Sequence, residues 1–80
     1  MPTVLRIGPY RFYFYSHEPN EPPHIHIDRD DLSVKFWLLT TSQARNYGFS
    51  SRELNRVELL VKENQKLLLE AWNGFFGPGG

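Results

Sequence analysis

The residues best suited to chemistry in this 80-residue chain lie in one short stretch, HEPNEPPHIHID at positions 17–28. The stretch holds all three histidines of the chain, His17, His24 and His26, together with three of its six prolines and three carboxylates. Imidazole and carboxylate groups bind metal ions, and imidazole also exchanges protons near neutral pH. We therefore consider metal binding and acid–base catalysis first.

The spacing of His24 and His26 puts two imidazoles on the same side of a β-strand, about 7 Å apart. Such a pair can chelate one divalent metal ion, with His17 or a carboxylate as a third ligand. The competing interpretation is structural, with imidazoles that hydrogen-bond loop carbonyls and pack on Tyr13 or Tyr15. We expect the structural interpretation, which requires no cofactor, and keep a divalent metal held by the three histidines as an alternative.

The same residue types could also cleave RNA by general acid–base catalysis. One of His24 and His26 would act as base and the other as acid, with Tyr15 beside them and Arg45 on the phosphate. The sequence does not show that these side chains converge. It contains no Gly-rich phosphate loop, no serine-nucleophile motif and no zinc-protease motif. Whether the protein is an enzyme therefore stays open at this point.

The elements that must position these residues are strands in the first half of the chain. Period-two alternation and β-prone residues predict four strands, VLRI (4–7), RFYFYS (11–16), HIHID (24–28) and SVKFWLL (33–39). Turn signals lie between them, Gly8-Pro9-Tyr10 and Arg29-Asp30-Asp31. Short connections of this kind predict an antiparallel meander.

The second half of the chain has a helical pattern. TSQARNYG (41–48) predicts a short connecting helix that ends at Gly48. Ser50 and Glu53 have the spacing of a capping box, and apolar residues then recur every three or four positions to about residue 75. We predict an α+β fold, in which a four-stranded antiparallel sheet carries a short connecting helix and one long C-terminal helix packed on one face.

The predicted C-terminal helix is too long for the predicted sheet. A helix over 51–75 extends about 37 Å at 1.5 Å per residue. Strands of five or six residues span only about 20 Å. We therefore expect the end that carries Leu68, Trp72 and Phe75 to fold over an edge of the sheet or to pack against another chain. The whole of 1–76 should form a single compact α+β domain, followed by a flexible Gly-rich tail at 77–80.

Alternation within the strands sorts their side chains onto two faces. One set is apolar and should turn toward the helix. The other face, which we expect to be the binding face, carries Tyr13, Tyr15, His17, His24, His26, Lys35 and Trp37. A face of this composition fits a half-exposed sheet surface, a protein interface, a surface for single-stranded RNA, or a catalytic or metal site.

Composition limits these alternatives. Nine basic residues balance nine acidic ones, so nucleic acid is not favoured as a partner and its binding would need a local basic patch. The absence of cysteine excludes disulfides and thiolate metal sites. No apolar run approaches the roughly 20 residues of a membrane span, and no signal peptide is evident. We expect a soluble cytoplasmic protein without a membrane partner.

Several motifs together resemble a known family. They are VLRI, YRFYFYSHEPNEPPHIHI, ARNYGFSxREL and the closing ENxxxLLxAW. In these motifs the chain resembles a small prokaryotic family known as a domain of unknown function, family 4160. The matching positions are Tyr15, His17, Glu18, Pro22, Pro23, His24, His26, Arg45, Asn46, Tyr47 and Gly48. The resemblance implies a short cytoplasmic protein whose gene adjoins that of a second small protein, in a toxin–antitoxin-like pair. It supplies no catalytic residue.

Our first functional hypothesis is therefore a binding protein, one member of a toxin–antitoxin-like pair. Its His/Tyr/Trp sheet face would contact a small partner protein encoded nearby or a second copy in a homodimer. The second hypothesis is an RNA-cleaving toxin that uses His24, His26, Tyr15 and Arg45. The third is a metal-binding protein that uses His17, His24 and His26.

Overall fold

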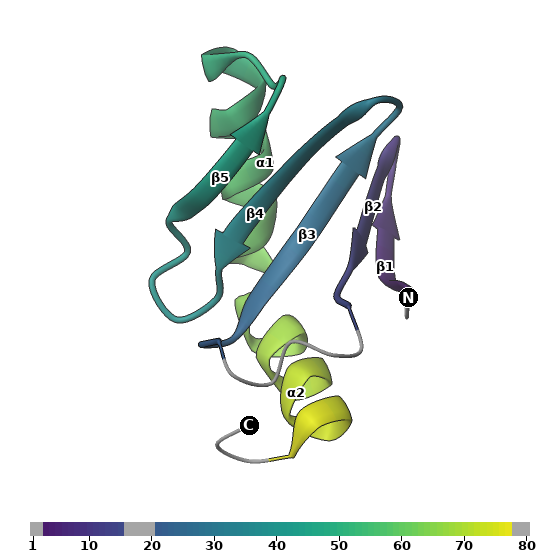
Figure 1. Ribbon diagram of the computed structural model, residues 1–80, viewed down its shortest axis with the longest axis vertical. Coiled ribbons are helices and arrows are strands. Elements are labelled where there is room, and N and C mark those ends of the chain that lie inside the picture. The colour runs from purple at the N-terminus through teal and green to yellow at the C-terminus, as the bar shows by residue number, and fades with distance from the viewer. Residues whose placement is uncertain (1–2, 16–20, 78–80) are drawn as a thin grey trace.

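The computed structural model describes residues 3–15 and 21–77, and within them the chain forms one five-stranded sheet and two helices (Figure 1). The elements are β1 (Thr3–Ile7), β2 (Tyr10–Tyr13), β3 (His24–Arg29), β4 (Leu32–Trp37), β5 (Gln43–Tyr47), α1 (Ser51–Glu63) and α2 (Gln65–Phe76). Neighbouring strands are antiparallel and follow chain order from β1 to β5. The predicted α+β class and antiparallel meander are confirmed.

The predicted number of strands was wrong, because 41–48 does not form the short connecting helix. Its central part is β5, which pairs with β4 so that Lys35 lies opposite Arg45 and Ser33 opposite Tyr47. A segment of eight residues is too short to hold a helix by itself, whereas pairing with β4 gives its backbone groups partners. Gly48 has the left-handed φ expected of a helix cap (+106°), but here it ends a strand.

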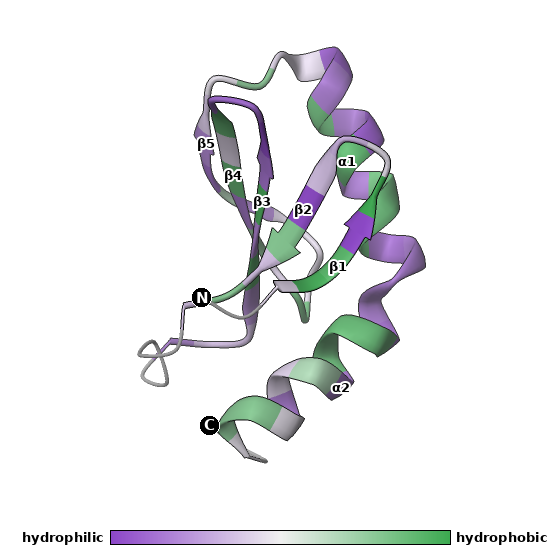
Figure 2. Cartoon of the chain, turned by 90° about the vertical axis from the view of Figure 1, so that its right-hand side faces the viewer, coloured by the Kyte–Doolittle hydropathy of each residue, from purple (hydrophilic) through white to green (hydrophobic). Residues whose placement is uncertain are grey.

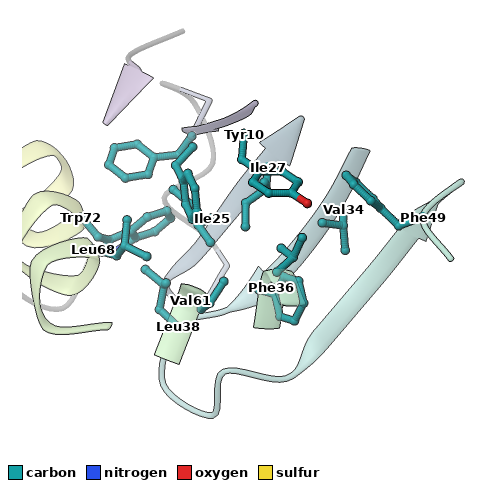
Figure 3. Close-up of a cluster of buried hydrophobic side chains, with 13 residues drawn as sticks. Tyr10, Ile25, Ile27, Val34, Phe36, Leu38, Phe49, Val61, Leu68 and Trp72 are labelled. Atoms are coloured by element: carbon teal, nitrogen blue, oxygen red, sulfur yellow. The ribbon is translucent and has the colours of Figure 1, made fainter. Parts of the chain in front are cut away.

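The apolar set of strand residues faces the helices, as predicted. Phe12, Ile27 and Val34 are cross-strand neighbours and are fully buried. Both helices contribute to the same core, α1 through Val57 and Val61 and α2 through the fully buried residues Leu68 and Trp72 (Figure 3). Figures 1 and 2 show α1 and α2 on one side of the sheet, with α2 reaching beyond the end where β3 begins.

The single long helix of the prediction is divided in two at Asn64. The Asn64 side chain donates to the carbonyl of Leu60 (2.8 Å). The next side chain, Gln65, donates to the carbonyl of Leu38 (2.7 Å) and so attaches the break to the connection after β4. The break removes the length mismatch, because α2 changes direction and passes under the end of the sheet.

Aromatic packing holds α2 in this position. The ring centroid of Trp72 lies 5.4 Å from that of Phe14 and 4.9 Å from that of His24. Leu68 and Trp72 are buried, whereas Phe75 is 46% exposed although its ring also contacts Phe14. Within the chain, Leu68 and Trp72 are therefore buried by contacts of α2 with residues beside β2 and at the start of β3.

The start of α1 is attached to the sheet by hydrogen bonds to a half-buried carboxylate, that of Glu53. Ser50 caps the helix by accepting a hydrogen bond from the Glu53 backbone (3.2 Å). In a capping box the Glu53 carboxylate would accept a hydrogen bond from the backbone N–H of Ser50, and here it does not. It accepts hydrogen bonds from Arg29 Nη2 (2.7 Å) and the Tyr10 hydroxyl (2.8 Å) instead. The bonds from Arg29, followed by that from Tyr10, lower the pKa of Glu53.

Two adjacent leucines on α2 provide a matched test of this packing. Leu68 is fully buried and Leu67 is 45% exposed. Leu68→Ala should reduce the free energy of unfolding by about 2–5 kcal/mol, because it removes buried methyl groups and leaves a cavity. That is a large share of the roughly 4–12 kcal/mol expected of a chain this size. Leu67→Ala should change it by less than about 0.5 kcal/mol. Urea denaturation measures both, and equal effects would contradict the observed orientation of α2.

The Glu53 network predicts a specific loss of stability in acid. The pKa of Glu53 is lowered in the folded state, so its contribution is present above pH 4.5, the ordinary value, and is lost as the pH falls below it. The free energy of unfolding should therefore decline less steeply below pH 4.5 in Glu53→Gln than in the wild type. Glu70→Gln, at an exposed position of α2, controls for the loss of one carboxylate. The same acid slope in both variants would count against the network.

Candidate binding face

Both helices lie on one side of the sheet (Figure 1), and we call the other side, which they do not cover, the open face. A single cross-strand row runs over four strands, because Tyr13 pairs with His26, His26 with Lys35, and Lys35 with Arg45. Residues directly opposite one another on antiparallel strands point to the same face. The open face comprises Arg6, Arg11, Tyr13, Tyr15, His24, His26, Asp28, Ser33, Lys35, Trp37, Arg45 and Tyr47.

The aromatic rings of the open face are fixed by one another. Tyr13 stacks on His26 with centroids 5.4 Å apart, and Tyr15 meets the edge of His26 at 4.7 Å. The Arg11 guanidinium lies 4.6 Å from the centre of the Tyr13 ring. Tyr13 is buried, and its hydroxyl donates to Asp28 (3.1 Å). Burial, followed by the neighbouring Tyr15 and Asp28, raises the pKa of Tyr13 well above its usual range.

His24 joins the sheet to α2. Its side chain is fully buried, and Nδ1 lies 2.8 Å from the carbonyl oxygen of Pro22. Because a carbonyl oxygen can only accept, Nδ1 donates this hydrogen bond. The ring lies 4.9 Å from Trp72, 5.2 Å from His26 and 5.9 Å from Trp37. A carbonyl hydrogen bond and aromatic packing are the contacts expected of a structural histidine.

The cations of the open face differ in whether a carboxylate is paired with them. Lys35 forms an ion pair with Glu21 and lies 4.8 Å from the centre of the Trp37 ring. Arg45 donates to the hydroxyl of Tyr47 (3.3 Å), and this hydrogen bond raises the pKa of Arg45. Among the described residues, the cations Arg6, Arg11, Lys35 and Arg45 face only the carboxylates Glu21 and Asp28. Within residues 3–15 and 21–77, this face therefore carries more cations than carboxylates, although the whole chain has balanced charge.

The structure brings together most of the residues predicted for the face, with one exception and several additions. Tyr13, Tyr15, His26, Lys35 and Trp37 share the open face, and His24 points to the same side of β3 but is fully buried against Trp72 of α2. His17 lies outside the described residues. Arg6, Ser33, Arg45 and Tyr47 also lie on this face and were not predicted to belong to it. Tyr47 could have been found from the period of two that it shares with Arg45, had 43–47 been read as a strand.

The arrangement bears differently on the two chemical alternatives. The cation adjacent to His26 is Lys35, and Arg45 lies one strand further away, about 10 Å from His26 between backbones. Over residues 3–15 and 21–77, no group of three or more His, Cys, Asp or Glu side chains is placed to hold a metal ion. The predicted third ligand, His17, is outside these ranges.

A pocket of about 320 Å³ lies apart from the open face. It lies between the β1–β2 turn, the end of β3 and the start of α1. Its lining residues are Pro9, Tyr10, Arg29, Ser50, Arg52, Glu53 and Arg56. Arg29 and Tyr10 are already bound to Glu53 there. None of the residues predicted to carry function lines this pocket.

Neither α1 nor α2 has the length and apolar content needed to cross a membrane.

Comparison with known proteins identifies the family of the chain. No curated protein and no solved structure matches the chain. A family model described as Domain of unknown function (DUF4160) matches residues 10–73, from the start of β2 into α2. The match includes the residues of the open face on β2, β3, β4 and β5, and it covers most of the chain, which therefore belongs to the DUF4160 family.

Proposed function

We propose that this protein is a binding module that docks a small partner protein on its open face, as one member of a toxin–antitoxin-like pair. The observation that carries the proposal is the ordered row of Tyr13, His26, Lys35 and Arg45 on the side of the sheet away from the helices. The resemblance of the sequence to a family with a small neighbouring gene product supplies the kind of partner.

The composition of the open face suits protein recognition. Tyr, Trp and Arg dominate the binding energy of protein interfaces. On this face Tyr47 is 56% exposed, Arg45 is exposed, and Tyr15 and Trp37 are half-buried. Several of these side chains are held before binding by ring contacts and by the bond between Arg45 and Tyr47. A side chain that is already ordered loses less entropy when a partner binds.

Single-stranded RNA is the second candidate ligand, and the local excess of positive charge favours it. Sheet-face RNA binders combine aromatic rings that stack on bases with cations that contact phosphates. Tyr13 weakens this candidate, since its ring is buried against His26 and offers no face to a base. An RNA-cleaving toxin has less support than an RNA-binding protein, because full burial keeps the His24 side chain away from an RNA phosphate.

The remaining alternatives have separate signatures. A homodimer through the open face would double the mass of the 9.4 kDa chain in solution. A metal-binding protein would take up one zinc or nickel ion per chain and lose it on His24→Ala or His26→Ala. An RNA-cleaving toxin would arrest bacterial growth on induction, and the same substitutions would relieve that arrest.

The proposal is tested by co-expressing the chain with the small protein encoded beside it and measuring the complex by light scattering and calorimetry. Tyr47→Ala and Arg45→Ala should each weaken binding about tenfold or more, as the loss of a Tyr or Arg that carries much of the binding energy does. Leu59→Ala is the matched control, because Leu59 is 55% exposed but lies on α1. Equal affinity for all variants would remove the open face from the interface.

A further inference from the structure

β5 presents an unpaired edge beside the open face. It is the last strand in the order β1-β2-β3-β4-β5, so its outer side has no neighbouring strand among the described residues. Gln43, Arg45, Asn46 and Tyr47 are exposed, and Ala44 is half-buried. The outward backbone N–H and C=O groups of such an edge form a ready template for a further strand.

The register of β5 indicates which charge a further strand should carry. On the inner side of Arg45 lies Lys35, whose charge is matched by Glu21. Arg45 itself donates to the Tyr47 hydroxyl, and among the described residues it feels the charge of Glu21 but forms no ion pair with any carboxylate. Opposite charges directly across a strand pair are favourable, so the position outside Arg45 suits a carboxylate.

The same residue disfavours a second copy of β5 at this edge. β5 pairs regularly with β4 over Arg45, Asn46 and Tyr47, with a register shift between Arg45 and Gln43. Arg45 is the central residue of Gln43–Tyr47, so the antiparallel register centred on it places Arg45 opposite Arg45 of the other copy. Like charges directly opposite one another are destabilising.

Tyr47 lies two residues after Arg45 on the same face of β5. An apolar or β-branched side chain on the added strand would pack on its exposed ring.

We propose that the partner contributes an acidic β-strand that adds to β5, with a carboxylate opposite Arg45 and an apolar side chain opposite Tyr47. The inference rests on the proposed function, because it extends the docking surface of the open face across its outer edge. Main-chain hydrogen bonds along β5 would supply affinity, and the two side-chain positions would supply selectivity.

The experiment uses a blocked peptide, Thr-Val-Thr-Glu-Thr-Val-Thr, and its control with Lys in place of Glu. The sequence is the same in both directions, so either strand orientation places the charged residue opposite Arg45. Titration into isotopically labelled protein should shift backbone amide signals of 43–47 and not those of β1. The Glu peptide should bind about fivefold more tightly than the Lys peptide, the factor given by a cross-strand ion pair of about 1 kcal/mol.

Changing the charge at residue 45 tests the proposal through the ratio of the two peptide affinities, which does not depend on how tightly either peptide binds. Arg45→Glu should reverse the preference in favour of the Lys peptide, and Arg45→Gln should abolish it. Arg45 is exposed, so circular dichroism should show both variants folded. The inference is overturned if neither variant changes the preference, if the shifts lie at β1, or if oligouridine but neither peptide binds through Arg45.

Failure of this inference is distinguishable from failure of the proposed function. If the partner complex depends on Tyr47 and Arg45 but the peptides show no charge preference, the open face binds the partner without strand addition. If the complex is also insensitive to both residues, the proposed function fails as well.

Discussion

Burial of the alternating apolar residues of β2, β3 and β4 against the helices is the constraint on which the rest of this structure depends. A shift of one residue in any of these strands would move Phe12, Ile27 or Val34 from the core to solvent. The register is therefore fixed by hydrophobic burial, which is the main favourable term in folding. The same register delivers Tyr13, His26, Lys35 and Arg45 to the opposite face in one row. The open face is thus a geometric consequence of the core.

Two attachments adapt the helices to this small sheet. At one end Glu53 binds side chains from β2 and β3 and holds the start of α1. At the other end the break at Asn64 lets α2 pass under the sheet, where Trp72 contacts Phe14 and His24. His24 consequently belongs to both parts of the molecule, because it lies at the start of β3 and its ring packs on α2. Its burial is more consistent with support of the open face than with chemistry on it.

Sequence reasoning succeeded where the periodicity was strong and failed where tertiary contacts decided the structure. The alternation in 24–28 and 33–39 predicted β3, β4 and the two faces, since period two is difficult to mistake there. The segment of β5 has a polar composition, and only its pairing with β4 makes it a strand. The break at Asn64 was missed because the buried residues on its two sides, Val61 and Leu68, are seven positions apart and so keep the phase of one continuous helix. Local sequence could not predict the bond from Gln65 to Leu38 that holds it.

The central claim is that the row from Tyr13 to Arg45 lies on the side of the sheet away from the helices. The most direct test is a set of nuclear Overhauser contacts in solution, combined with broadening by a soluble paramagnetic agent. The account predicts contacts between the Tyr13 and His26 rings, and strong broadening of Tyr47 signals but not of Phe12 or Phe36 signals. Contacts from Tyr13 or His26 to Val57 or Val61 on α1 would contradict it, because they would place the row inside the core.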